Sequence, residues 1–564
     1  MGDVRKDRGP KSVKLSRGSW ARLREIAEVL AHHGLLWMLD GLGLSGHLSW
    51  GRRIRAKKLP APDANWPERV RLVLAALGPT YVKLGQLASM RPDVLPAPLV
   101  RALARLQDDV PPFAYQEVVE IVEQAWGTSL AEHLAWFDPT PLAAASIGQV
   151  HRARLLDGRA VVIKVRRPGI VDRSESDFRI LRALAERAER RHAWARKSAL
   201  LDLVDELVAA MRDELDFTVE ARNTDTGRKN LARDQHVMVP KVIWPLTYGD
   251  VLVLESLAGL KISEVPYQAH LPATRQQLAR RFVHSLYRQI FVFGFFHADP
   301  HPGNVHIDDQ GRLIFLDWGL VGTLSREMRS RSIQLVLGLV KGQADLVAEA
   351  LLAMGSVSPS ANHRNLIRDI ERLRHRYYES ELRNFQLGQA LTDLFNVAQR
   401  HEVRIPAEYM LLAKVAVIAD GVVRGLDPEF SLVEMGKPWA VELMWERINP
   451  AHSVSAATTA LSHWAENLLR VPDELERALA TLSRGEIHIV LEQKNIDGIL
   501  GHWEKLINRV VLSLLVGAVV LGLALIVRLH NVTRISVSGY GFLVVLVLVL
   551  AGGMAVGVLR RRRL

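Results

Sequence analysis

The amino-acid sequence predicts an α+β fold of two lobes, with a helical extension before it and a hairpin of two transmembrane helices after it. Runs of β-branched residues at 160–165 and 251–254 flank a helical segment, which is typical of a small lobe built on a sheet. From about residue 271 the apolar residues recur at helical spacing, which predicts a second, helical lobe. Near the end of the chain, two long runs without a charged residue predict the transmembrane hairpin.

Breaks in the pattern divide the chain into segments. The Pro-Ala-Pro sequence at 60–62 precedes the helical extension, and the Asn-Pro pair at 449–450 interrupts a connector after the helical lobe. Residues 20–44 form an amphipathic pattern that either packs on the body of the protein or lies on a bilayer. The predicted segments are a basic tail with this amphipathic helix (1–60), the helical extension (61–125), the small lobe (126–260), the helical lobe (261–440), a helical connector (441–505) and the transmembrane hairpin (506–564).

The composition of the 564 residues excludes several kinds of chemistry. Cysteine is absent, which excludes disulfides, thiol catalysis and zinc or iron–sulfur sites ligated by cysteine. The formal net charge of +12 suggests a nucleic-acid partner, but no helix-turn-helix, zinc-finger or RNA-binding motif accompanies it. We therefore expect no nucleic acid as a partner, and an anionic membrane surface instead.

Two short motifs near the middle of the chain carry residues typical of a nucleotide site. In the run H-A-D-P-H-P-G-N, Asp299 precedes Asn304 by five positions, and Asp317 follows an apolar run at 313–316. Protein-kinase folds use this order and approximate spacing to hold a nucleoside triphosphate and its magnesium. Asn304 and Asp317 are the predicted magnesium ligands, and Asp299 is the candidate catalytic residue that orients or deprotonates an acceptor. Taken alone, the first motif is equally typical of a surface turn.

A lysine upstream adds to this pattern. Lys164 lies in the β-branched run A-V-V-I-K-V, as does the strand lysine that reaches the phosphates in kinases. Such a lysine needs a carboxylate to hold it, and the helical segment at 214–220 supplies acidic residues, of which Glu220 is the predicted partner. A single lysine in a strand is otherwise usually a solvated edge residue. Because Asp299 and Asp317 follow in the same chain, the nucleotide-binding and catalytic role is favoured for Lys164.

Two further segments are predicted to contact the nucleotide. Where a kinase carries a glycine-rich loop over the phosphates, this chain reads A-A-A-S-I-G-Q-V-H at 143–151. A Cβ restricts the backbone where glycine would bring its N–H groups against phosphate, so the nucleotide is expected to be held differently. Residues 255–259 are the predicted hinge, whose backbone usually meets the adenine. The predicted contacts are Ala143, Ala144, Ala145, Ser146 and Gly148 in the loop, and Glu255 and Leu257 in the hinge.

In content and order, these segments resemble the UbiB/ADCK family of atypical kinase-like proteins. The resemblance spans about residues 75–325 and includes K-L-G-Q at 83–86 and L-Q-D-D-V-P-P at 106–112. One departure is Trp318 in place of the usual Phe after the metal-binding Asp. The resemblance implies a protein-kinase-like two-lobed fold that binds ATP and Mg2+.

The resemblance also implies a regulatory role for three residues. In that family the helical extension, here bearing Lys83 and Gln86, folds over the place where a peptide substrate would lie. Its lysine pairs with an acidic residue that matches Glu214 here. Phosphorylation of another protein would then be sterically disfavoured.

The expected function is that of a membrane-anchored atypical kinase or ATPase. Members of the family are linked to isoprenoid quinone biosynthesis or lipid homeostasis, so the resemblance implies membrane lipids, including isoprenoid quinone precursors, as partners. Two alternatives remain open: a phosphotransferase acting on a small molecule or a protein, and a nucleotide-gated scaffold that recruits other membrane enzymes. A homodimer, or an association with enzymes of quinone biosynthesis, is open as well.

The localisation is predicted from the end of the chain. The uncharged runs at 510–527 and 540–559 are each close to the 20 or so residues that a spanning helix needs, and they lack the polar stripe of a buried core helix. Lysine and arginine flank the pair at 505–509 and 560–563, against two arginines in the turn between the runs. The positive-inside rule then predicts a multi-pass protein of the cell membrane with its kinase-like domain in the cytoplasm.

Overall fold

The computed structural model describes residues 17–35, 65–91, 94–106, 110–197, 199–265, 273–357, 363–378 and 387–428. The chain divides into two units, Met1–Asn449 and Pro450–Leu564, and all described residues belong to the first. The predicted connector at 441–505 and the predicted hairpin at 506–564 therefore lie outside the described residues.

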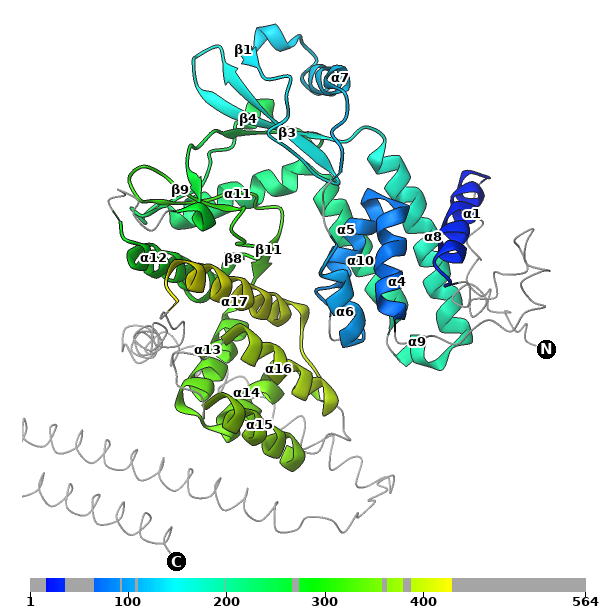
Figure 1. The fold of residues 1–564 in the computed structure, drawn as a ribbon, viewed down its shortest axis with the longest axis vertical. Coiled ribbons are helices and arrows are strands. Elements are labelled where there is room, and N and C mark those ends of the chain that lie inside the picture. Colours follow the sequence, from blue (N-terminus) through cyan, green and yellow to red (C-terminus); the bar gives the residue numbers. More distant parts are fainter. Residues whose placement is uncertain are drawn as a thin grey trace, which may run out of the picture. The chain divides into compact units, whose positions relative to one another are not determined.

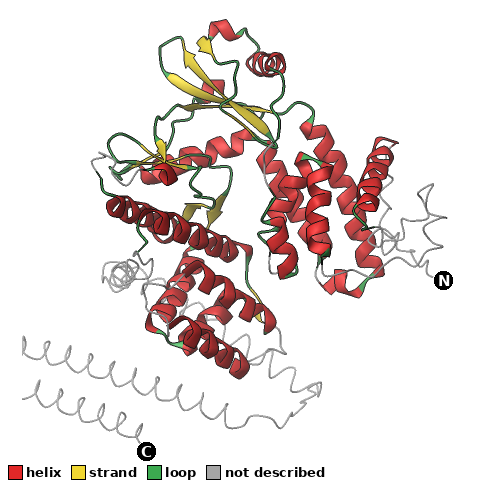
Figure 2. Ribbon diagram, in the orientation of Figure 1, coloured by secondary structure: helices red, strands yellow, loops and turns green. Residues whose placement is uncertain are grey.

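The small lobe is built on an antiparallel five-stranded sheet (Figures 1 and 2). Its central strand has the alternating pattern of a half-buried strand, so Ile163 points to one face and Lys164 to the other. A helix, α7 (Tyr115–Trp126), packs its Val118 and Val122 against the face that buries Ile163. Lys164 is thereby directed to the opposite face. The strands are β1 (Leu134–Phe137), β2 (Ala143–Ala144), β3 (Gly148–Leu155), β4 (Ala160–Arg166) and β6 (Val251–Glu255), in the order β1-β3-β4-β6 with β2 on β3.

The predicted helical segment at 214–220 is divided between two helices in the structure. The segment is broken at Asp216, whose carboxylate accepts a hydrogen bond of 3.0 Å from the Thr218 N–H and caps the next helix. At about 100° per residue, Glu214 and Glu220 would lie on different faces of one continuous helix. The break allows both to reach the same place. The helices between β4 and β6 are α8 (Ile170–Arg191), α9 (Ala193–Lys197), α10 (Leu200–Leu215) and α11 (Phe217–Leu231).

The helical extension packs on α8 and α10 (Figure 1). The helix before it, α1 (Arg17–His32), buries Leu23 and Ile26 against α4 and α8, and its Arg22 forms an ion pair of 2.7 Å with the fully buried Asp177. This contact settles the open alternative for the amphipathic pattern, which packs on the body of the protein as far as the described residues show. The helices of the extension that bear on this packing are α4 (Trp66–Leu77), α5 (Pro79–Ala88) and α6 (Ala97–Leu103).

The second lobe is mainly helical, as predicted, but short strands interrupt it. Strands of three residues follow the first helix. They are too short for the spacing of apolar residues to distinguish a strand from a helix. They are β8 (Phe295–His297), β9 (Val305–Ile307), β10 (Leu313–Phe315) and β11 (Val321–Thr323); two-residue strands are β5 (Val237–Met238), β7 (Leu260–Lys261), β12 (Ser356–Val357) and β13 (Val403–Arg404). The helices are α12 (Arg275–Tyr287) with a π-helical turn at Arg288–Phe293, α13 (Arg326–Lys341), α14 (Ala344–Met354), α15 (His363–Tyr378), α16 (Leu387–Arg400) and α17 (Ala407–Leu426). Single 3-10 turns lie at Leu130–Glu132, Trp244–Leu246 and Ile262–Glu264.

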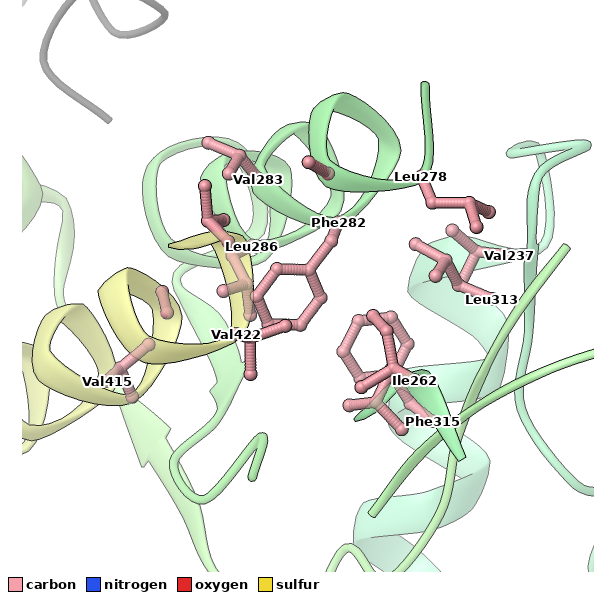
Figure 3. Packing of buried hydrophobic residues seen from close by; sticks show 14 of the residues in the cluster. Val237, Ile262, Leu278, Phe282, Val283, Leu286, Leu313, Phe315, Val415 and Val422 are labelled. Carbon is pink, nitrogen blue, oxygen red and sulfur yellow. The ribbon is translucent and has the colours of Figure 1, made fainter. Parts of the chain in front are cut away.

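One helix, α17, connects two buried clusters of this lobe. In the first cluster, Phe282 of α12 stacks on Phe315 of β10 at 6.2 Å, and Val415 and Val422 of α17 pack beside them (Figure 3). In the second cluster, Tyr409 of α17 packs with residues of α14, α15 and α16. Because α17 is buried on both sides, its position relative to the strands of the first cluster is fixed.

The predicted localisation to the cell membrane, with two spanning helices and a cytoplasmic kinase-like domain, is corrected by the structure. Among the residues that it describes, no helix is both long and apolar enough to cross a membrane. The longest of them, α8, has 22 residues and carries charged side chains in every turn. The uncharged runs at 510–527 and 540–559, on which the prediction rested, lie outside the described residues.

Candidate nucleotide site

Most of the predicted site residues meet around one cavity of about 70 Å³, room for a few water molecules. It lies where β4, the Ala-rich loop, α5, the break between α10 and α11, and the loop after β10 come together. The predicted residues that line it are Lys83, Ala145, Ser146, Gly148, Lys164, Glu214, Glu220 and Asp317.

The predicted partnership of Lys164 with Glu220 is present in the structure. The Lys164 ammonium lies 2.7 Å from a carboxylate oxygen of the buried Glu220 and 5.1 Å from the centre of the Phe217 ring. Strand β4 directs the lysine toward α11, and the cap at Asp216 starts α11 one turn before Glu220. The pair is therefore fixed by the register of the strand and by the point at which the helix begins.

The charges around the cavity shift the pKa values of its carboxyl groups in opposite directions. Burial, with repulsion from Asp317, raises the pKa of Glu220 to about 7, although Lys164 opposes this. The positive charge of Lys164 lowers the pKa of Asp317 to about 2, against burial and with help from Lys83. Burial acts to lower the pKa of Lys164, but Asp317 and Glu220 outweigh it and raise that pKa. Asp317 is thus ionised at neutral pH, whereas Glu220 titrates there.

The stability of Glu220→Gln relative to the wild type is expected to be higher at pH 8 than at pH 5. The pKa of Glu220 is about 7 in the folded protein against 4.5 ordinarily, so the folded state binds the proton more tightly than the unfolded chain does. Its ionisation therefore lowers the free energy of unfolding above pH 7, and this cost disappears as the pH falls toward 4.5. Thermal midpoints measured from pH 5 to pH 8 check the prediction.

The control for this variant is Glu264→Gln, which removes a carboxylate from the exposed pair of Lys261 and Glu264. It is expected to change the midpoint less at every pH, because exposed pairs contribute little. A difference between Glu220→Gln and wild type that stays constant from pH 5 to pH 8 would contradict the assignment.

Asp317 adopts a backbone conformation that few residues tolerate. Its φ is +51°, in the left-handed region, and its carboxylate accepts a hydrogen bond of 3.2 Å from the Gly319 N–H. Such conformations cost energy and cluster at sites where a side chain must point in one direction. Next to it, Trp318 is buried, with its ring 5.0 Å from that of His297 and its carbonyl bonded to the Asn223 amide.

Backbone hydrogen bonds bring Asp299 and Asn304 next to this segment. The Leu316 N–H donates to the Asn304 carbonyl at 2.8 Å, and the Asn304 side-chain amide donates to the Asp299 carbonyl at 3.1 Å. The buried His297 ring lies 2.8 Å from the Leu316 carbonyl through Nε2 and accepts the Asp299 N–H through Nδ1 at 3.1 Å. His297 therefore braces the loop.

The Ala-rich loop contains an unsatisfied polar group at the cavity. The Ser146 hydroxyl is buried, and no described residue is its hydrogen-bond partner. Buried hydroxyl groups are normally hydrogen-bonded. This one is therefore suited to bond with a phosphate oxygen of a bound nucleotide, or with a water molecule beside it. Gly148 instead allows β3 and β4 to pair closely, because a Cβ there would collide with the Val165 carbonyl on the neighbouring strand. Ala143 and Ala144 form β2 and pair with β3.

The donor set suits a magnesium ion that is held mainly by phosphate. Within the described ranges, no group of three or more His, Cys, Asp and Glu side chains is arranged to hold a metal ion. Asn304 and Asp317 supply one amide oxygen and one carboxylate, which matches the few protein ligands that magnesium takes beside a triphosphate. The residues present therefore fit Mg2+ bound together with a nucleotide.

Lys83 and Glu214 form an ion pair at the edge of the cavity. Lys83 comes from α5 of the extension and Glu214 from the end of α10, so the extension reaches the edge of the cavity. Gln86, also on α5, instead donates to the Leu106 carbonyl at 3.1 Å and fastens the extension to itself.

The hinge residues lie apart from this cavity. Glu255 ends β6, and its carboxylate accepts a hydrogen bond of 3.2 Å from the Lys241 N–H. Leu257 follows in the link to β7. Neither lines the cavity, and their contact with an adenine stays a prediction.

Sequence reasoning missed two charged residues, Asp213 of α10, which lines the cavity, and Lys414. Lys414 of α17 lies 3.1 Å from the Asp299 carboxylate. No motif marks it, and the available signal was a single cation between apolar residues in the middle of a buried helix.

Comparison with known proteins identifies two adjoining segments. The sequence matches the ABC1 atypical kinase-like domain over residues 105–351 and the UbiB helical domain over residues 370–431. The "uncharacterized protein sll1770" of Synechocystis sp. is 32% identical over 442 residues, which cover 78% of this chain and 75% of that protein. A Clostridium pasteurianum protein, described as uncharacterized and located in the hydrogenase 1 5′ region, is 27% identical, with 92% of this chain and 96% of that one covered.

A plant protein and several solved structures are also similar. "Protein ACTIVITY OF BC1 COMPLEX KINASE 8, chloroplastic" of Arabidopsis thaliana is 33% identical over 449 residues, which cover 73% of this chain and 59% of that one. The structure of the Rv3197–erythromycin complex from Mycobacterium tuberculosis is 23% identical, covering 63% of this chain and 90% of that one, with a TM-score of 0.42. A Stt7 homologue from Micromonas, soaked with ATP, is 16% identical, covering 33% of this chain and 50% of that one, with a TM-score of 0.21.

The match to the ABC1 domain agrees with the α+β fold of two lobes described above. Together with a relative that is 32% identical over three quarters of its length, it confirms the resemblance seen in the motifs. The chain belongs to the UbiB/ADCK family of ABC1 atypical kinase-like proteins.

Proposed function

We propose that this protein binds ATP with Mg2+ in the cavity around Lys164 and hydrolyses it, in support of isoprenoid quinone biosynthesis or lipid homeostasis. The observation that carries the nucleotide site is the meeting of Lys164, Glu220 and Asp317 at one cavity beside the unsatisfied Ser146 hydroxyl. A positive side chain, an ionised carboxylate and an unpaired hydroxyl are the groups that a triphosphate and its metal require.

The roles of the residues follow from their positions. Lys164 would hold the phosphates and Glu220 would hold Lys164, as their ion pair indicates. Asp317 and Asn304 would be ligands of Mg2+, which neutralises the phosphate charge. Asp299 would accept the proton of a water molecule whose oxygen bonds to the terminal phosphorus, while the bond from that phosphorus to the bridging oxygen breaks.

Hydrolysis is favoured over transfer to a protein because the extension reaches the site. The ion pair of Lys83 with Glu214 lies at the cavity edge, so α5 occupies space that a peptide acceptor would need. The lipid or quinone part of the proposal is carried by membership in the family. The Arabidopsis relative is named as a kinase, which agrees with the phosphate chemistry.

Calorimetric titration with ATP tests the nucleotide site. Binding is expected with ATP and magnesium present, and is expected to weaken strongly when a chelator removes the metal. Absence of binding in both conditions would overturn the assignment. The pathway is tested separately by profiling quinones and lipids in a strain that lacks the gene: wild type is expected to restore the profile, and Asp317→Asn is not.

A further inference from the structure

The Asp299 side chain forms an ion pair with a residue from outside the kinase-like domain. The Lys414 ammonium lies 3.1 Å from Asp299 Oδ1, and both side chains are about one-third exposed, at 29% and 33%. Lys414 belongs to α17, within the 370–431 segment that matches the UbiB helical domain; we call this segment the helical domain. Asp299 lies in the 105–351 segment. The pair therefore joins the two domains at the candidate base.

The packing of α17 fixes the direction of Lys414. Its neighbours along the helix are both buried, Ala413 in the cluster with α14 to α16 and Val415 in the cluster with α12 and β10. A helix held on both sides cannot rotate without exposing one of these clusters. The lysine is thus presented to the loop of Asp299 by a rigid element.

This contact brings a positive charge to Asp299 from outside its own loop. The four residues between Asp299 and Asn304 contain no lysine or arginine. Burial lowers the pKa of Lys414, Asp299 and Glu214 act to raise it, and Lys83 acts to lower it. Lys414 is therefore within electrostatic range of the ion pair of Lys83 with Glu214.

We propose that Lys414 is a positioning residue for Asp299, so that the helical domain completes the catalytic site of the kinase-like domain. Lys414 holds the carboxylate in one orientation, and Asp299 then accepts the proton from the attacking water. The inference rests on the proposed function, in which Asp299 is the base.

The kinetic test uses Lys414→Met, which keeps the apolar stem and removes the charge. We expect kcat for ATP hydrolysis to fall about 10- to 30-fold, because misplacing a catalytic group is costly, while the KM for ATP stays within about twofold. Lys414→Arg is expected to recover most of the rate. In an Asp299→Asn background, Lys414→Met is expected to have no further effect. Unchanged kcat in Lys414→Met, or an equal loss in both backgrounds, overturns the inference.

The matched control is Lys229→Met. Lys229 forms a pair of 2.7 Å with Asp225 on the surface of α11, so the variant breaks a lysine–aspartate pair away from the cavity. It is expected to leave kcat unchanged.

A second measurement does not depend on turnover. Urea unfolding of wild type, Lys414→Met, Asp299→Asn and the double variant is expected to be non-additive by about 2- to 5-fold in the unfolding constant. Additive effects would overturn the inference even if the protein proved not to hydrolyse ATP. Conversely, wild type that binds and hydrolyses ATP, with Lys414→Met equal to it, leaves the proposed function standing and rejects the role of Lys414.

Discussion

Asp317→Asn is expected to weaken the binding of ATP with magnesium by about 100-fold or more, while the fold is retained. The substitution preserves the shape of the side chain and removes the charged oxygen that a hard cation prefers. Asn is among the residues that adopt the left-handed region most readily, so the φ of +51° adds no new strain. The variant therefore tests the charge of the Asp317 side chain while the backbone conformation at this position is kept.

Calorimetry and circular dichroism check this prediction, with Asp157→Asn as the control. Asp157 pairs with Arg159 in an exposed turn, so its replacement is expected to leave binding unchanged. Because the pKa of Asp317 is about 2, wild type carries this charge throughout the range from pH 6 to pH 8. Equal affinity in the variant and wild type would remove Asp317 from the site.

The parts of the site that could be predicted are those encoded in short local patterns. Lys164 lies in a β-branched run whose alternation settles both the strand and the face on which the lysine lies. The loop residues Asp299 and Asn304 are held by hydrogen bonds that span only a few positions, so their spacing in the sequence reflects their spacing in space. The same holds for Asp317, which lies two residues after the end of β10.

Two kinds of feature could not be predicted. One is a helix end that competes with a continuous helix, and the other is a contact between residues that lie far apart in the sequence. Asp216 lies between Leu215 and Phe217, whose apolar side chains continue a helical pattern, and only the capping bond to Thr218 shows that the helix is broken there. Lys414 reaches Asp299 through the packing of a helix far along the chain, which no local spacing encodes. The direction of Gln86, toward a carbonyl of its own segment, is likewise a tertiary contact.

The aromatic residue that departs from the family pattern also has a tertiary cause. A Cβ built on Gly227 of α11 would lie 2.6 Å from the nearest atom of the Trp318 ring, so the indole fills the space that a side chain at 227 would need. The ring is buried and stacks on Phe295 at 6.0 Å. Trp318 therefore holds α11, which carries Glu220, against the loop of Asp317.

Gly227→Ala is accordingly expected to lower the free energy of unfolding by about 3 kcal/mol, because an added methyl must displace a buried ring. Trp318→Phe alone is expected to cost about 1 to 2 kcal/mol through the cavity that it leaves. In the double variant the smaller ring makes room for the methyl, so the two costs should not add, and the non-additive term should exceed about 1 kcal/mol. Denaturant unfolding of the four proteins measures these terms.

The control is Gly421→Ala on α17, where a Cβ would meet no atom within 4 Å. The same substitution in that helix is expected to stabilise the protein by up to about 1 kcal/mol, since alanine has the higher helix propensity. If Gly227→Ala behaved like Gly421→Ala, the contact with Trp318 would not be the reason for a glycine at 227. If it destabilises and Trp318→Phe rescues it, the tryptophan and the glycine form one packing unit between α11 and the loop of Asp317.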